Sequence, residues 1–201
     1  MRVGHEIHGS DDKPMRAPGK ALSAWLCSLL ALVALARAVD GAEAASEYQV
    51  KAVFLFNFTH FVEWPPQAFS SPGEPFVIGI LGEDPFGTRI DDVIRNERIA
   101  DHPLVVRRFR HAEDLGDCQM LFVGRDESAG FGQVVARLGH RPVLVVSEIE
   151  GSAEHGAMIQ FATESSHVRL RINADAAHAA GLVISSKLLH LAEIVSPRSG
   201  D

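Results

Sequence analysis

Residues 76–81 read FVIGIL, a continuous apolar run that is too short for a buried helix and is followed by the turn-forming sequence GEDP at 82–85. Two more runs of this kind come later, MLFV at 120–123 and VLVV at 143–146. Unbroken apolar strands are typical of a parallel sheet that helices cover on both faces. The three runs therefore predict an α/β domain with a mixed, mostly parallel central sheet flanked by helices.

The segment before the first of these strands predicts a long helix over Ser46–Val62. Apolar side chains recur there at the spacing of one helical face, so we expect that face to be buried. The residues expected on it are Val50, Val53, Phe54, Phe58 and Phe61, and the face is widened by Leu55, Phe56 and Val62. The pattern ends at Trp64-Pro65-Pro66, because proline lacks a backbone donor and disfavours helical backbone in the residue before it.

Two shorter helices and one more strand are predicted between the apolar runs. Asp84 followed by Pro85 is typical of a helix N-terminus, and this helix would turn its apolar residues between 90 and 94 inward. Pro103–Phe109 predicts a strand. Ser128–Leu138 predicts a helix whose C-cap is Gly139.

The C-terminal part of the chain has a different pattern. Met158–Thr163 and Val168–Ile172 alternate apolar and polar residues, which predicts an antiparallel hairpin at one edge of the sheet. Asn173 is placed to cap a last helix, which we expect over Ala174–Val195. The sequence shows neither repeats nor a low-complexity linker, so residues 45–201 are predicted to form a single domain.

Residues 15–44 have the three parts of a signal peptide. A basic start at Met15 precedes the apolar stretch Ala21–Ala36, which is shorter than the roughly 20 residues of a membrane span. Small residues then form a cleavage-type site, so we expect cleavage after Ala44 and export to the periplasm. Acidic residues upstream of Met15 favour it over Met1 as the translation start.

Charge and cysteine content exclude several kinds of protein. The formal net charge is −7, which argues against nucleic acid as a partner because phosphates bind to basic surfaces. Only two cysteines occur, Cys27 and Cys118, too few for a disulfide framework or a four-cysteine zinc site. Cys27 lies in the predicted signal peptide. Cys118 then remains either as a buried thiol or as the partner in an intermolecular disulfide.

The sequence lacks the residue spacings that enzymes and metal sites use. The glycines of 79–87 do not follow G-x-G-x-x-G, and none of the histidines forms H-E-x-x-H. Ser185-Ser186-Lys187 is one residue short of S-x-x-K. We therefore predict no catalytic, cofactor-binding or metal-binding residues, and a protein that is not an enzyme.

The ends of the predicted parallel strands form the first candidate surface. Ligands on open α/β sheets bind beyond the carboxyl ends of the strands. Polar residues follow each apolar run there, and these are Glu83, Asp84, Arg125, Asp126, Ser147 and Glu148. They are candidates for contact with a partner or ligand. The alternative is that they are ordinary hydrated loop residues.

Trp64 and Pro65 form the second candidate surface. An aromatic residue beside a rigid proline pair is a suitable contact for a partner protein, since aromatic residues are enriched at the energetically dominant positions of interfaces. The alternative is that Trp64 closes the core.

The mature sequence resembles the YfiR/HmsC-like periplasmic proteins along its whole length. The resemblance rests on EYQVKA at 47–52 with FLFNF at 54–58 and FVEWP at 61–65, on ILGEDPFG at 80–87, CQMLFV at 118–123 and VLVVS at 143–147, and on IN at 172–173 with AGLVISSKLL at 180–189. Members are secreted, non-enzymatic α/β domains. This chain departs from the family in one respect. The member after which the family is named is richer in cysteine and is stabilised by disulfides, whereas only Cys118 remains in the mature sequence here. Redox control by an internal disulfide therefore cannot be transferred to this chain.

The resemblance implies a function in signalling. We expect a periplasmic protein that represses an inner-membrane signalling enzyme, of the diguanylate cyclase or histidine kinase type, by binding the enzyme's periplasmic sensor region. The sequence also leaves open that the protein forms a homodimer. The alternative function is a small-molecule-binding sensor that uses the strand ends, and an unrecognised hydrolase would require a nucleophile beside a base.

Overall fold

The computed structural model describes residues 45–164 and 167–196. The predicted signal peptide lies outside these residues. Within the described part, no helix has the length and apolar character needed to cross a bilayer.

The central sheet has eight strands in the described part of the chain, in the order β10-β8-β7-β6-β5-β2-β4-β3. Five neighbouring strands are parallel, as the apolar runs predict: β4 (His102–Phe109), β2 (Phe76–Leu81), β5 (Met120–Val123), β6 (Leu144–Ser147) and β7 (Ile159–Glu164). All residues of β2, β5 and β6 are buried, because helices cover both faces of these strands.

The antiparallel strands lie toward the two sides of this sheet. The predicted hairpin is confirmed: β8 (His167–Ile172) pairs with β7 over six residue pairs. A two-residue strand, β10 (Glu193–Ile194), adds in parallel beyond β8. On the other side, β3 (Arg98–Ile99) pairs antiparallel with β4.

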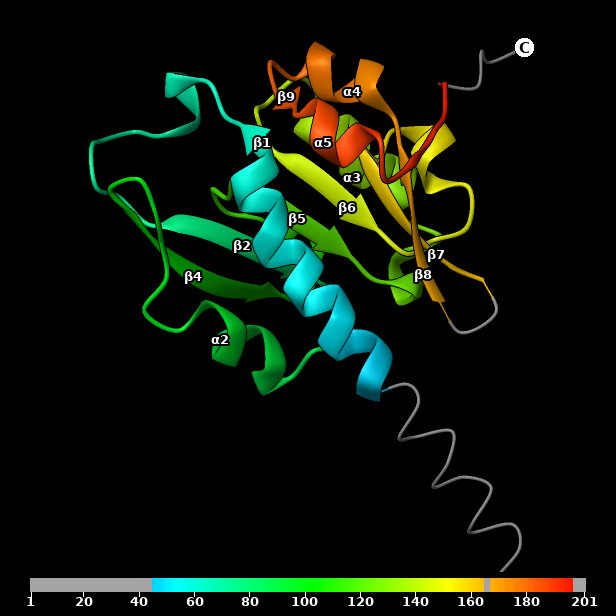
Figure 1. Cartoon of the computed structure of the whole chain (residues 1–201), viewed down its shortest axis with the longest axis horizontal. Coiled ribbons are helices and arrows are strands. Elements are labelled where there is room, and N and C mark those ends of the chain that lie inside the picture. Colours follow the sequence, from blue (N-terminus) through cyan, green and yellow to red (C-terminus); the bar gives the residue numbers. More distant parts are fainter. Residues whose placement is uncertain (1–44, 165–166, 197–201) are drawn as a thin grey trace, which may run out of the picture. The chain divides into compact units, whose positions relative to one another are not determined.

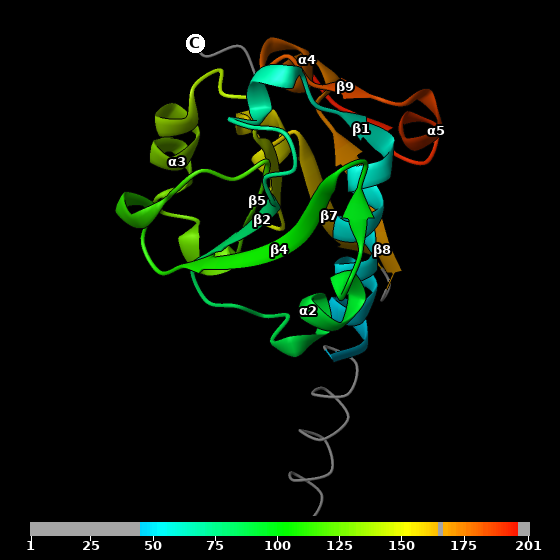
Figure 2. The ribbon, with the colours of Figure 1, turned by 90° about the vertical axis from the view of Figure 1, so that its left-hand side faces the viewer.

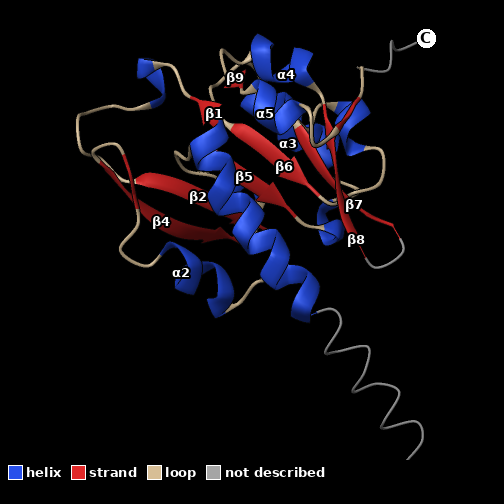
Figure 3. Ribbon diagram, in the orientation of Figure 1, coloured by secondary structure: helices blue, strands red, loops and turns tan. Residues whose placement is uncertain are grey.

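Helices cover the two faces of the sheet unequally (Figures 1 and 3). One face carries the long helix of residues 45–61, together with α2 (Thr88–Ile94), α4 (Ala174–Ala179) and α5 (Ser186–Leu189). The other face carries α3 (Phe131–Leu138). In Figure 2 the sheet separates α3 from helix 45–61 and α5.

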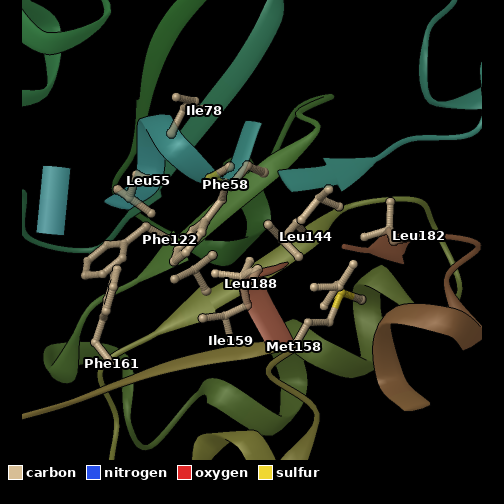
Figure 4. Packing of buried hydrophobic residues seen from close by; sticks show 14 of the residues in the cluster. Leu55, Phe58, Ile78, Phe122, Leu144, Met158, Ile159, Phe161, Leu182 and Leu188 are labelled. Carbon is tan, nitrogen blue, oxygen red and sulfur yellow. The ribbon is translucent and has the colours of Figure 1, made fainter. Parts of the chain in front are cut away.

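The larger hydrophobic core lies beneath helix 45–61. Figure 4 shows Leu55 and Phe58 of this helix directed toward Phe122 of β5 and Phe161 of β7. The Phe58 and Phe161 rings stack with centroids 5.9 Å apart. Aromatic packing thus fixes the helix against the middle of the sheet.

The predicted buried face of this helix is partly wrong. Phe58 is fully buried, but Val50 and Val53 are 44% and 41% exposed. Leu55 is buried as expected, but Lys51, which was not expected on this face, also points inward, and both side chains are inaccessible to solvent. The reason is that a lysine finds a buried carboxylate partner, which rotates the helix away from the face that apolar spacing alone selects.

The single C-terminal helix predicted over Ala174–Val195 is also wrong. Asn173 does cap a helix, because its side chain accepts from the backbone N–H of Ala176, but α4 ends after one and a half turns. Gly181 then adopts a left-handed backbone with φ +76°, which reverses the chain. A short strand, β9 (Val183–Ile184), pairs antiparallel with β1 (Val62–Glu63) before α5 begins.

Asp84 caps a turn and not the helix that follows it. Its carboxylate accepts from the backbone N–H groups of Phe86 and Gly87. The helix α2 begins later, at Thr88, and buries Ile90 and Ile94 as predicted. A short Asx-type turn therefore separates β2 from its helix.

Candidate functional site

The strand-end residues predicted from the sequence lie along two open clefts. Arg125 and Glu148 line a cleft of about 710 Å³. Glu83, Asp84 and Asp126 line a second cleft of about 500 Å³. Ser147 lines neither of these clefts: it is buried, and its hydroxyl donates to the carbonyl of Val123 on the neighbouring strand.

A buried ion pair forms the inner wall of the larger cleft. The Nζ atom of Lys51 lies 2.6 Å from an oxygen of Glu148, and these side chains are 0% and 3% exposed. A second carboxylate, Glu47, lies 2.5 Å from the same nitrogen, one helical turn before Lys51. Lys51 is therefore held by two carboxylates, one from its own helix and one from the end of β6.

Tyr48 completes this cluster. Its hydroxyl donates to Glu148 across distances of 3.0 and 3.2 Å to the two carboxylate oxygens. Its ring lies 4.7 Å from the Lys51 nitrogen, within the range of a cation–π contact. Tyr48 and Lys51 stand one turn apart on helix 45–61, so both reach Glu148 from the same side.

The electrostatic surroundings change the pKa values of two residues of the cluster, Tyr48 and Glu47. Burial and the charge of the nearby Glu148 raise the pKa of Tyr48 to about 12. Burial acts to raise the pKa of Glu47, but hydrogen bonds from Lys51 and Thr163 outweigh it, and the net effect is a lowered pKa. Tyr48 thus stays a neutral donor and Glu47 a charged acceptor near neutral pH.

Arg125 lies over the outer side of the cluster. Its guanidinium is 3.8 Å from Glu148 and 4.0 Å from Glu47, distances that are too long for hydrogen bonds. The side chain is 61% exposed and lines the cleft together with the apolar Ile149, Phe161 and Ala162. Arg125 therefore retains donors that a bound group could accept from.

The second cleft is organised by charges from neighbouring loops. Arg108 of β4 donates to Asp84 at 2.7 Å and contacts Asp91 of α2 at 2.5 Å. Asp126 accepts from the backbone N–H of Glu83 at 2.7 Å, and a Cβ on the adjacent Gly82 would lie 2.3 Å from its carboxylate. Gly82 is thus required by the close approach of Asp126. The carboxylates of Asp84, Asp91 and Asp126 already have structural partners.

Trp64 and Pro65 lie at the opposite end of the sheet. The Trp64 indole donates to the carbonyl of Gln119, just before β5, at 2.8 Å. Its ring meets Phe76 edge to face with centroids 4.8 Å apart. The side chain is half-buried and engaged with the core, so the geometry supports the alternative in which Trp64 closes the core.

Sequence reasoning missed Glu47, Tyr48, Lys51 and Thr163. A usable signal was present, because Lys51 stands four residues before Leu55 and seven before Phe58, the spacing of a buried helical face. A lysine in such a position needs a buried carboxylate, and Glu148 was already a candidate.

Cys118 is a buried thiol, 5% exposed, and burial raises its pKa to about 12. This makes it a poor nucleophile at neutral pH. Among residues 45–164 and 167–196, no group of three His, Cys, Asp or Glu side chains is placed to hold a metal ion.

The sequence matches the YfiR/HmsC-like family over residues 48–193. The chain belongs to this family. The matched region includes Tyr48, Lys51, Arg125 and Glu148, and hence most of the buried cluster and its cleft. YfiR/HmsC-like proteins are periplasmic regulators of diguanylate cyclases, a role that implies contact with a membrane-associated sensor protein.

No curated protein matches the sequence. Among solved structures, the chain is similar to an ABC domain in complex with L-Trp from Streptococcus pneumonia, at 12% identity and a TM-score of 0.46. The alignment covers 60% of this chain and 55% of that structure, so the chain spans about half the length of the protein it matches.

The buried ion pair gives a prediction about stability. Lys51→Met and Glu148→Gln should each lower the free energy of unfolding by about 3–5 kcal/mol, because each leaves a buried charge without its main partner. The double variant Lys51→Met/Glu148→Gln should regain much of this loss, since it removes both charges. Urea denaturation of the four proteins measures the coupling. Losses that simply add in the double variant would contradict a direct interaction.

Tyr48 gives a prediction about pH, and it is the only tyrosine in the chain. Tyrosinate absorbance at 295 nm should therefore report this residue alone, with a midpoint near pH 12 in the folded protein and near 10 in urea. The pKa of Tyr48 is higher in the folded than in the unfolded protein. The neutral tyrosine therefore contributes fully to the free energy of unfolding below pH 10, and this contribution is lost as the pH rises toward 12. Tyr48→Phe should remove the absorbance change, and a folded midpoint near 10 would contradict the cluster.

Proposed function

We propose that this protein is a periplasmic repressor of an inner-membrane diguanylate cyclase and that it acts by binding the periplasmic sensor region of the cyclase. Membership of the YfiR/HmsC-like family over residues 48–193 is the observation that carries this proposal. The sequence supports it with a signal-peptide pattern before Ala44 and with the lack of a nucleophile–base motif. A histidine kinase with a similar sensor region is the other kind of membrane target that the sequence allows.

Repression in this proposal is a shift between two states of the sensor. The protein must bind the inactive state more tightly than the active one, and a change from 1:99 to 99:1 needs about 5.5 kcal/mol of differential binding. A contact surface of this kind requires side chains that are exposed and that do not already make short hydrogen bonds within the fold. Arg125 and the exposed Glu83 at the strand ends meet this requirement better than Trp64 does.

Arg125 allows a direct test with a matched control. Arg125→Gln should leave periplasmic abundance and the unfolding midpoint close to wild type, since the Arg125 side chain is 61% exposed and lies 3.8 Å or more from its carboxylate partners, yet it should raise cellular cyclic-di-GMP. Arg137→Gln on α3 is the control, because that arginine is exposed on the other face of the sheet. Trp64→Ala should instead lower the unfolding midpoint and abundance together.

Two results would count against this proposal. If deletion of the gene leaves cyclic-di-GMP unchanged, the target is not a diguanylate cyclase. If Arg125→Gln represses as well as Arg137→Gln at equal abundance, the strand-end surface does not contact the sensor.

A second candidate function is small-molecule sensing, and the cleft of about 710 Å³ favours it. Arg125 has free donors there above an apolar floor of Ile149, Phe161 and Ala162. Convergent polar groups over an apolar surface are typical of ligand sites. In this function, the bound molecule would adjust the affinity of the protein for its sensor.

Native mass spectrometry of protein purified from the periplasm tests this second function. A small molecule retained in the cleft should appear as a defined added mass on the wild-type protein and on Arg137→Gln. The added mass should be lost or strongly reduced in Arg125→Gln. Absence of any added mass from the wild-type protein, or retention of the same mass by Arg125→Gln, would remove this cleft as its site.

A further inference from the structure

The larger cleft of the candidate site lies in the plane of the sheet and not over one of its faces. Side chains alternate between the two faces along a strand, so a cleft over one face is lined by every second residue. Three consecutive residues of β7, Phe161, Ala162 and Thr163, line this cleft, and so do the three consecutive residues 148–150 that follow β6. The cleft therefore follows the edge of β7 at the point where β6 has ended.

β7 continues past its last pairing with β6. The two strands pair in parallel over two residues of each, ending at Ser147 and Gln160. On its other side β7 pairs with β8 along its whole length, and Figure 1 shows these two strands running on beyond the end of β6. Within the part of the chain that the structure describes, no strand pairs with the β6 side of β7 after Gln160. We call the β6 side of residues 161–164 the free edge.

The pairing with β8 leaves the backbone of Thr163 directed toward the free edge. In antiparallel strands, pairs of residues that hydrogen-bond to each other alternate with pairs whose backbone groups point outward. The backbone N–H of Asn173 donates to the carbonyl of Met158 at 2.9 Å. This bond makes the adjacent pair, Ile159 and Ile172, one of the second kind. Counting in steps of two places Thr163 in the same class, so its N–H and C=O groups can pair with an added strand.

We propose that the free edge of β7 takes up an extended segment of a partner protein as an additional strand, which fills the larger cleft beyond the end of β6. The segment belongs to the periplasmic sensor region that the protein represses, so this inference rests on the proposed function. The free edge covers the last four residues of β7, which corresponds to about 13 Å of extended chain. Backbone pairing of this kind provides affinity, and the side chains along the cleft provide specificity.

The charges along the cleft indicate the chemistry of the segment. Glu150 lines the cleft and is 95% exposed, with a long contact of 3.9 Å to Arg171. Glu164, at the end of the free edge, is 56% exposed and lies 3.7 Å from the same arginine. A lysine or arginine of the segment can pair with either carboxylate, and the exposed donors of Arg125 can bond to its backbone carbonyls. A short, extended segment that carries a basic residue therefore fits this cleft.

Both walls of the cleft are fixed before a partner binds. The chain after β6 is held by Glu148, which lies 2.6 Å from the buried Lys51. The free edge is held by Thr163, whose hydroxyl donates to Glu47 at 2.9 Å. Native proteins usually block strand edges, because unpaired backbone groups attract other strands. An edge that is open within a rigid cleft costs little to order when a strand is added.

Proline at position 163 tests the backbone of the free edge. Thr163→Pro removes the outward N–H and leaves the hydrogen bonds between β7 and β8 in place, since that N–H does not take part in them. The matched variant is Thr163→Val, which has nearly the same shape, keeps the N–H and loses the hydroxyl bond to Glu47. Both are made in the full chain and purified after export. Their unfolding midpoints should be close to each other.

Cellular cyclic-di-GMP compares these variants in the bacterium. At equal periplasmic abundance, the level should be higher with Thr163→Pro than with Thr163→Val, because the two differ at the backbone N–H. Arg137→Gln on α3 provides the reference for full repression, since it lies on the other face of the sheet.

A peptide probe tests the same edge in the purified protein. The probe is a fluorescein-labelled peptide of sequence Thr-Val-Lys-Val-Thr with blocked ends, and its binding is followed by fluorescence anisotropy. N-methylation of its backbone amides keeps the side chains but removes strand hydrogen bonds, so binding to the wild-type protein should weaken at least about tenfold. Exchange of its lysine for glutamate should weaken binding as well, because the cleft carries exposed carboxylates. Thr163→Pro should bind the unmodified probe at least about tenfold more weakly than Thr163→Val.

Four results would overturn the proposal. The wild-type protein does not bind the probe, or it binds the N-methylated probe as tightly as the unmodified one, which would leave the cleft to a small molecule. A folded Thr163→Pro represses as well as Thr163→Val at equal abundance. A dimer of the wild-type protein is lost in Thr163→Pro, which would assign the free edge to a second copy. If Thr163→Pro does not fold, the N-methylated probe decides, because it uses the wild-type protein.

Failure of the proposed function gives a different pattern. If deletion of the gene leaves cyclic-di-GMP unchanged while the wild-type protein still prefers the unmodified probe, the free edge binds a strand but the cyclase is not the source of that strand. If deletion raises cyclic-di-GMP while Thr163→Pro still represses, the repressor function stands and the free edge is not its contact.

Discussion

The buried pairing of Lys51 with Glu148 is the constraint on which the arrangement of this domain depends. A lysine with no solvent exposure is tolerated only because carboxylates lie 2.5 and 2.6 Å from its nitrogen and an aromatic ring packs beside it. This pairing sets the rotation of helix 45–61. It turns Leu55 and Phe58 into the core and Val53 out to solvent, so the interior packing and the outer surface of the helix have one common cause.

The elements that could be predicted from the sequence are those governed by short-range pattern. The strands β5 and β6 follow from unbroken apolar runs, and the β7–β8 hairpin from strict alternation. The face of helix 45–61 could not be predicted by apolar spacing, because the partner of Lys51 is 97 residues away in the sequence. The C-terminal helix was predicted too long because the helical spacing of apolar residues continues past Gly181. The left-handed backbone of Gly181 follows the end of α4, and the chain then forms β9.

The candidate site was predictable in location but not in composition. The rule that ligands bind beyond the carboxyl ends of parallel strands selected Arg125 and Glu148, and both line the larger cleft. The rule could not distinguish side chains that already hold the fold together from side chains that are exposed for binding. Ser147 is buried in a bond between strands, and Asp126 holds the backbone of Glu83, whereas the Arg125 guanidinium is largely exposed. That distinction depends on burial and distance, which are properties of the folded chain.

The buried cluster and the larger cleft share residues of helix 45–61 and of the end of β6. The cleft reaches the helix through Glu47, whose carboxylate also holds Lys51. Glu148 belongs to both in the same way, because it lines the cleft and lies 2.6 Å from Lys51. The carboxylates that fix the rotation of helix 45–61 therefore also form the charged wall of the cleft, so a substitution of Glu47 or Glu148 changes stability and binding together. Arg125 separates the two, because it lines the cleft without a short contact to either carboxylate.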